Sequence, residues 1–169
     1  MIQRCTSSLF LAVGISGLLF VTGIPKSFAG TMSQPGSSAM PSATVGGPLA
    51  KQLQGKPVLA EIYASWCPGC KNIAPTLSSL QQAYQGKVNF VTLDVSDQST
   101  TRKSEAMANR LGLGNFFASN KSQTSTVAII DPATGMILKQ FQNNPNKAEY
   151  KAVLDSAIGK MHSMSSMHQ

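Results

Sequence analysis

Two cysteines set between an apolar run and a helical pattern constrain this chain more than any other feature. The run PVLAEIYA, residues 57–64, is nearly continuous in apolar side chains, as in strands buried on both faces. The motif SWCPGC follows at residues 65–70, and apolar residues then recur at helical spacing. The first cysteine, Cys67, therefore lies at the start of a predicted helix. The pair is open to three interpretations: a redox centre, half of a metal site, or a structural disulfide.

The N-terminus has the three-part layout of a secretory signal peptide. Arg4 precedes an apolar stretch at about residues 9–24, and small residues end the segment at Ala29. This layout predicts a cleaved signal peptide over residues 1–29. The alternative is an uncleaved membrane anchor, although glycine, serine and threonine interrupt the stretch, which is also short for a full span.

Export changes what the cysteines can do, because compartments outside the cytoplasm permit disulfides. We expect the mature chain in the periplasm or an equivalent extracytoplasmic lumen, tethered to the membrane if the signal is not cleaved. Cys5 leaves with the signal peptide, so that Cys67 and Cys70 remain and no cysteine is left for a long-range bridge. Residues 30–50 are rich in Gly, Ser and Pro, which predicts a flexible lead.

The rest of the chain predicts one α/β domain over residues 51–160. Its elements follow one another as strand, helix, strand, helix, strand, strand, helix, which predicts a mixed central sheet with helices on both faces. They are a strand at 56–64, a helix from the cysteines to about 86, a strand at 88–95, a helix at 104–111, a hairpin at 125–131 and 136–142, and a helix from about 144 to 161. Phe116 and Phe117 fall in a predicted loop, either as core residues, which we favour, or as a contact surface.

The charge pattern argues against a nucleic-acid partner. The formal net charge is +7, with 14 Lys and Arg against 7 Asp and Glu. The basic residues are scattered, as on a solvated surface, and form no stripe with interleaved aromatic residues.

The position of the cysteines at a helix start predicts different roles for them. Unpaired backbone N–H groups and the positive end of the helix dipole stabilise a thiolate there, which predicts a lowered pKa for Cys67. Cys70 lies one turn further on, within reach of a disulfide. Cys67 is therefore the predicted attacking thiol, and Cys70 the resolving thiol that releases the partner from a mixed disulfide.

The segment PVLAEIYASWCPGCKNIAPTL resembles the active-site region of the thioredoxin family. Trp66 directly precedes the first cysteine, Lys71 directly follows the second, and Pro75 stands where the family carries a helix-kinking proline. The order of strands and helices in the predicted domain also resembles the family's fold. The resemblance implies a thioredoxin-like three-layer fold, a redox-active Cys67–Cys70 disulfide, and a monomer that uses no organic cofactor.

Glu61 stands six residues before Cys67, where the family usually carries a buried acid that moves protons at the resolving cysteine. The resemblance gives Glu61 this role, to which a buried carboxyl with a raised pKa is suited. The alternative is that strand alternation points Glu61 at solvent.

Two positions depart from the family pattern. The dipeptide between the cysteines is Pro68-Gly69, the reverse of the order in the cytosolic reductant type, so the direction of electron flow stays open. The stretch Thr124-Ser125-Thr126 stands where the family carries a cis-proline that shapes the substrate groove, with Ser125 as the best positional equivalent. This departure puts partner docking in doubt.

Metal binding is the competing interpretation. A structural zinc site needs four ligands, and the histidines, His162 and His168, lie beyond the predicted domain. The predicted flexible tail, residues 161–169, adds Met164 and Met167, and thioether and imidazole groups suit copper(I). A copper-binding or metallochaperone module that uses the two cysteines and this tail is thus the alternative function.

The sequence therefore predicts an exported thioredoxin-like thiol-disulfide oxidoreductase. Its partners would be thiols and disulfides of exported proteins. A membrane-embedded thiol carrier would supply its electrons, or an oxidising partner would accept them if the chain introduces disulfides.

Overall fold

A computed structural model describes residues 43–166 of the chain. The predicted signal peptide and most of the predicted lead lie outside these residues, as do Met167 and His168. The described elements are a short 3-10 helix η1 (Lys51–Leu53), strands β1 (Val58–Tyr63), β2 (Asn89–Asp94), β3 (Thr126–Ile130) and β4 (Ile137–Gln142), and helices α1 (Pro68–Ala83), α2 (Gln98–Leu111), α3 (Gly114–Asn120) and α4 (Lys147–Ser166).

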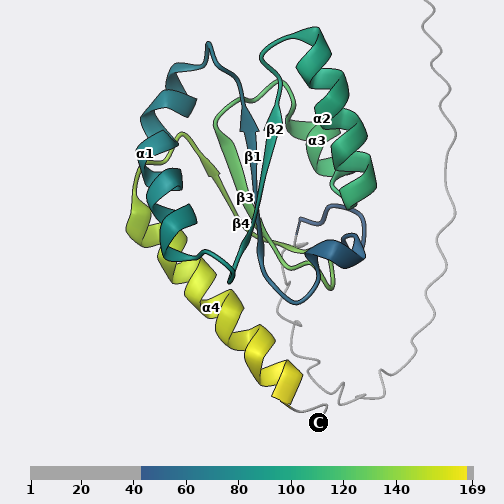
Figure 1. The fold of residues 1–169 in the computed structure, drawn as a ribbon, viewed down its shortest axis with the longest axis vertical. Helices are drawn as coiled ribbons and strands as arrows, with labels where there is room; N and C mark the ends of the chain where they lie inside the picture. Colours follow the sequence, from purple (N-terminus) through teal and green to yellow (C-terminus); the bar gives the residue numbers. More distant parts are fainter. Residues whose placement is uncertain (1–42, 167–169) are drawn as a thin grey trace, which may run out of the picture. The chain divides into compact units, whose positions relative to one another are not determined.

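The described strands form one mixed sheet in the order β2-β1-β3-β4 (Figure 1). Strand β1 runs parallel to β2 and antiparallel to β3, and β3 pairs antiparallel with β4 across the predicted turn. Central position and double-sided burial explain the continuous apolar run, since five of the six β1 residues are buried.

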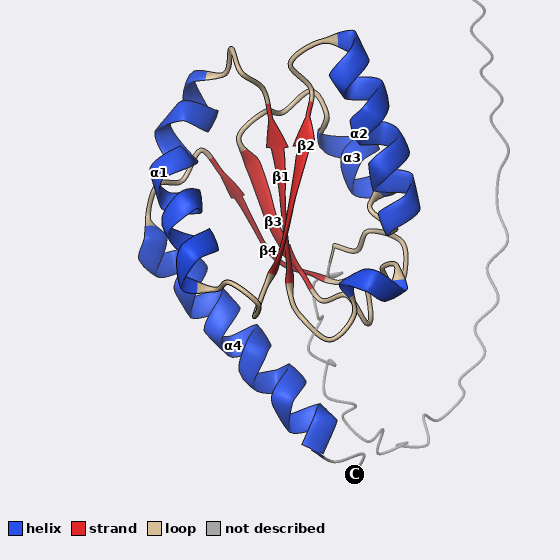
Figure 2. Ribbon diagram, in the orientation of Figure 1, coloured by secondary structure: helices blue, strands red, loops and turns tan. Residues whose placement is uncertain are grey.

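Helices cover both faces of the sheet, with α1 and α4 on one side and α2 and α3 on the other (Figure 2). Successive residues of β1 enter the two cores alternately, as the two-residue period of a strand requires. The core under α1 and α4 contains Leu59, Ile73, Leu80, Tyr84, Val88, Val127, Ile129, Phe141, Tyr150 and Leu154. The core under α2 and α3 includes Val58, Ala60, Ile62, Leu93, Leu111, Phe116, Phe117 and Ala128. The predicted α/β class and layer arrangement are confirmed.

Two helical features differ from the predictions. Helix α2 begins at Gln98 instead of residue 104, because Asp97 caps it: its carboxylate accepts from the Thr100 N–H, and the Thr100 hydroxyl accepts from the Asp97 N–H. Phe116 and Phe117 lie in helix α3 and not in a loop. Both are buried, so their interpretation as core residues is confirmed.

The packed structure reaches beyond residues 51–160 at both ends. Val45 and Leu49, in the predicted lead, are buried, and the Val45 N–H donates to the carbonyl of Gly135 in the β3–β4 turn. Helix α4 continues through the predicted tail as far as Ser166. Within residues 43–166, no helix has both the length and the apolar character that a membrane span requires.

Candidate active site

The loop between β1 and α1 brings the two cysteines together. Cys67 is the N-cap of α1, and its sulfur accepts a hydrogen bond from the Cys70 N–H at 3.2 Å. Pro68 occupies the first helical turn, where a missing N–H removes no helical bond. Both cysteines are free thiols, 4% and 1% exposed. The predicted placement of Cys67 at a helix start is therefore confirmed.

Other residues of the predicted motif lie around this turn. Trp66 is 61% exposed, and its indole N–H donates to the carbonyl of Ser96 at 2.9 Å. Lys71 is exposed, and Pro75 lies inside α1. Ser96 was not among the predicted site residues, and its hydroxyl accepts from the Ser65 N–H at 2.8 Å. Its position in a polar cluster directly after a strand was the available signal.

The two thiols have opposite electrostatic environments. Burial raises the pKa of Cys67, but hydrogen bonds from the Cys70 thiol, the Thr124 hydroxyl and the backbone N–H groups of Cys70 and Gly69 hold the net pKa below its usual value. Burial, together with the neighbouring Cys67, raises the pKa of Cys70 to about 11. At neutral pH, a larger fraction of Cys67 than of Cys70 is therefore ionised to the thiolate.

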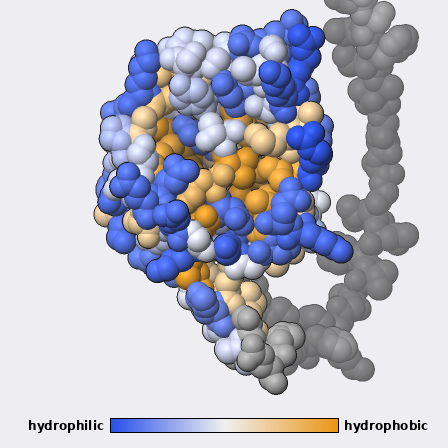
Figure 3. Space-filling model, viewed as in Figure 1, coloured by the Kyte–Doolittle hydropathy of each residue, from blue (hydrophilic) through white to orange (hydrophobic). Residues whose placement is uncertain are grey.

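Glu61 is buried, which excludes the alternative that it points at solvent. Burial raises the pKa of its carboxyl to about 7. Glu61 and Cys70 line one cavity of about 200 Å³ between α1 and the β2 edge of the sheet, together with Tyr63 and Phe90. Figure 3 shows apolar surface gathered between α1 and α2, over the sheet. Glu61 and the resolving cysteine therefore border the same cavity.

The segment 124–126 lies directly against the cysteine turn. Ser125 has a left-handed backbone (φ 64°), which costs a non-glycine residue about 1 kcal/mol. Its N–H donates to the Ile62 carbonyl at 2.8 Å, beside the start of the cysteine loop. A Cβ at Gly69 would lie 2.7 Å from the Ser125 hydroxyl oxygen, so the two residues are in close contact.

These features have counterparts in known proteins. Residues 48–113, which include η1, β1, α1, β2 and α2, match the family described as Thioredoxin. This chain contains a thioredoxin-like domain. The match ends before Ser125, so the departure at that position lies outside it.

Several known proteins are similar to the thioredoxin-like domain. The thiol:disulfide interchange protein TxlA homolog of Synechocystis sp. is 47% identical over 51 residues, 30% of this chain and 28% of that protein. The thioredoxin-like protein HCF164, chloroplastic, of Arabidopsis thaliana is 46% identical over 43 residues, 25% of this chain and 16% of that protein. These matches span less than a third of either relative. A thiol:disulfide interchange protein structure from Chlorobium tepidum TLS is 17% identical, with a TM-score of 0.49 over 69% of this chain and 97% of its own.

Gly69→Ala tests the contact between the cysteine turn and Ser125. The added methyl group would lie 2.7 Å from the Ser125 hydroxyl oxygen and 3.2 Å from Asn143 Cγ. We expect the free energy of unfolding, measured by denaturant titration, to fall by about 1–3 kcal/mol. Gly159→Ala in α4 is the control, because nothing lies within 4 Å of its added Cβ. Equal stability of Gly69→Ala and the native chain would contradict the described contact.

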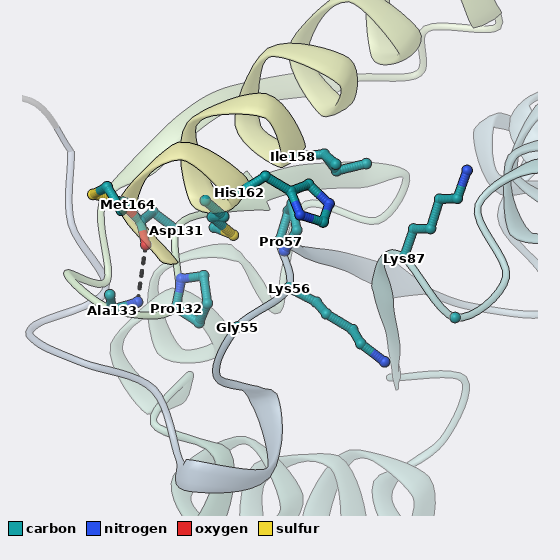
Figure 4. Close-up of a pocket in the computed structure, with 12 residues that line it drawn as sticks. Gly55, Lys56, Pro57, Lys87, Asp131, Pro132, Ala133, Ile158, His162 and Met164 are labelled. Carbon is teal, nitrogen blue, oxygen red and sulfur yellow. Dashed lines mark hydrogen bonds between the residues drawn. The ribbon is translucent and has the colours of Figure 1, made fainter. Parts of the chain in front are cut away.

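A larger cavity, of about 400 Å³, lies at the other end of β1 (Figure 4). It is lined by Lys56 and Pro57, which precede β1, and by His162 and Met164 of α4. The six residues of β1 lie between this cavity and the cysteine loop, a span of about 20 Å at 3.3 Å per residue. Among residues 43–166, no three His, Cys, Asp or Glu side chains come together as metal ligands. The structure therefore does not favour a copper site that joins the cysteines to His162 and Met164.

Proposed function

We propose that this chain is an exported thiol-disulfide oxidoreductase that exchanges disulfides with protein substrates through Cys67 and Cys70. The difference between the two thiols carries the proposal: a thiolate-stabilising helix start holds one, and a raised pKa keeps the other protonated. Similarity to a thiol:disulfide interchange protein supports the same reaction class.

The reaction proceeds in two exchanges. The Cys67 thiolate attacks a substrate disulfide, whose S–S bond breaks as a mixed disulfide forms, and the released substrate thiolate takes up a proton. Cys70 then loses its proton and attacks the Cys67 sulfur. The Cys67–Cys70 disulfide forms and the second substrate thiolate leaves. The substrate gains two electrons and the chain loses two; the reverse sequence introduces a disulfide into a substrate.

Glu61 accepts the proton of Cys70 in the second exchange. Its carboxyl lines the same cavity as Cys70, and a pKa of about 7 lets it hold or release a proton near neutral pH. The dithiol itself carries the two electrons, so the proposed cycle uses no organic cofactor.

A Cys70→Ser variant tests the proposal. Without the resolving thiol, the mixed disulfide between Cys67 and a substrate has no internal route to release, so covalent complexes accumulate. We expect bands on non-reducing gels that disappear on reduction and that contain this chain and an exported protein. Cys67→Ser with Cys70 intact is the matched control and should capture nothing. Equal capture by the two variants would contradict the assigned roles.

The direction of exchange follows from the reduction potential of the Cys67–Cys70 pair. Equilibration with glutathione measures it, and for this two-electron couple about 30 mV corresponds to a tenfold change in equilibrium constant. A reducing value supports a reductase supplied by a membrane thiol carrier. A strongly oxidising value supports an oxidase that introduces disulfides.

Export and the monomeric state belong to the same proposal. The signal-peptide layout of residues 1–29 supports export to the periplasm or an equivalent lumen. Mass spectrometry of the chain from an extracytoplasmic fraction tests cleavage after Ala29, and recovery of the full-length chain in membranes would favour an anchor. Sedimentation of the purified protein tests the monomeric state.

A further inference from the structure

Gln142, the last residue of β4, contacts the segment 124–126 beside the cysteines through both the nitrogen and the oxygen of its side-chain amide. It pairs with Thr126 across the β3–β4 ladder. Its amide N–H groups donate to the Thr124 carbonyl at 2.9 Å and to the Ser125 hydroxyl at 3.2 Å. Its amide oxygen accepts from the Thr126 hydroxyl at 2.5 Å. One exposed side chain thus contacts three consecutive residues.

The segment held by Gln142 has a strained backbone that needs surrounding contacts to keep it in place. Ser125 has a left-handed backbone, which is unfavourable for a residue with a Cβ atom. It also packs against Gly69. The next residue of the chain after Gln142, Asn143, also has a positive φ (46°) and donates its N–H to the Ser125 carbonyl at 3.1 Å. Backbone strain persists where surrounding contacts fix it, and Gln142 supplies several of these contacts.

Thr124 is the link from this segment to the reaction. Its side chain is one of the groups that lower the pKa of Cys67, and its carbonyl accepts from the Gln142 amide at 2.9 Å. A hydroxyl can stabilise a thiolate only while its oxygen stays within hydrogen-bond distance of the sulfur. The amide of Gln142 fixes the backbone that carries this hydroxyl.

We propose that Gln142 is a positioning residue of the cysteine site, which holds the segment 124–126 against Gly69 of the cysteine turn and thereby favours the thiolate of Cys67 and the reduced form of the pair. The inference deepens the proposed function, on which it rests for its biological meaning. Gln142 does not touch the reacting sulfur itself.

The effect of Gln142 on the titration of Cys67 can be separated from the effects of the other titratable groups near Cys67. Cys70 contacts it directly, and Glu61 lines the cavity of Cys70; Lys71 follows on α1 and Asp94 ends β2. Gln142 is neutral, and the hydrogen bonds of its side chain described above go to Thr124, Ser125 and Thr126 and to none of these groups. A change in the titration of Cys67 then reports the loss of the amide.

Gln142→Leu removes the amide and leaves an apolar side chain that branches one carbon nearer the backbone. Loss of a whole hydrogen bond to a charged group shifts an equilibrium about tenfold or more, so partial release of Thr124 should lower the Cys67 thiolate fraction at a given pH about threefold to tenfold. The pH profile of iodoacetamide modification, with Cys67 identified by peptide fragmentation, measures this fraction. The reduction potential should also become more reducing, because the reduced form is stabilised less.

Gln140→Leu is the matched control. Gln140 lies on the same face of β4, is also exposed, and donates to the Asn120 side chain at 3.3 Å, away from the cysteines. We expect it to leave the thiolate titration and the potential unchanged. If the two variants titrate alike, the proposal is wrong.

A double-mutant cycle shows whether Gln142 acts through Thr124. Thr124→Val removes the hydroxyl and should lower the thiolate fraction at least as much as Gln142→Leu. In the Thr124→Val background, Gln142→Leu should then have no further effect; fully additive effects would overturn the proposed route. Titration of Cys67 does not require a protein substrate. If the native chain fails to exchange disulfides but the cycle behaves as expected, the proposed function falls and this inference stands.

Discussion

Iodoacetamide will modify Cys67 faster than Cys70 in the reduced native chain at neutral pH, by about tenfold or more. Only the thiolate reacts. The pKa of Cys67 lies below its usual value of 9.0 and that of Cys70 is about 11, so the thiolate populations differ at least about a hundredfold. The lower intrinsic nucleophilicity of the more acidic thiol offsets part of this difference.

Peptide fragmentation after short reaction times measures the two rates separately. Initial rates are needed because modification of Cys67 changes the surroundings of Cys70. Unfolding in denaturant is the control: it removes the helix start and the burial, and the two rates should converge. Faster modification of Cys70 in the native chain would reverse the assignment of attacking and resolving thiols.

Replacement of Glu61 by glutamine will change how stability depends on pH. The carboxyl has its pKa raised from 4.5 to about 7 by burial, so the folded chain holds this proton more tightly than the unfolded chain does. The free energy of unfolding therefore falls as pH rises from about 4.5 to about 7. Relative to Glu61→Gln, the native chain should lose about 3 kcal/mol between pH 4 and pH 8.

Denaturant titrations at both pH values measure this difference, and a constant effect of the amide cancels in it. Glu105→Gln, at an exposed position of α2, is the control and should show no such loss relative to the native chain. The same Glu61 variant should slow release of mixed disulfides by Cys70 about a hundredfold, as loss of a general base does. Parallel pH dependence in Glu61→Gln and the native chain would remove the basis for its proton-transfer role.

Strong local patterns made much of the fold predictable. The apolar run of β1 reflects burial on two faces, and the spacing of Ile73, Leu80 and Tyr84 reflects the single buried face of α1. Helix α3 was missed because it has seven residues, begins with glycine and has no side-chain cap. The early start of α2 was missed because its cap pairs Asp97 with Thr100, where the usual pattern has a glutamate or glutamine.

The site divides in the same way between local and distant contributions. The cysteines and their helix start are contiguous in the sequence, and the position of Glu61 followed from the resemblance. Gln142 carried no sequence signal, because it reaches Thr124 only through the pairing of β4 with β3. The left-handed backbone of Ser125 was equally hidden, since nothing about a serine between two threonines indicates that conformation.

The exposed indole of Trp66 gives the chain a built-in optical reporter. The sequence contains one tryptophan, placed directly before Cys67 and hydrogen-bonded to the loop after β2. Tryptophan fluorescence of the protein therefore originates from a single point at the cysteine turn. Changes in emission during a reaction can be followed in the unlabelled protein, and they report on this turn and not on the distant end of the sheet.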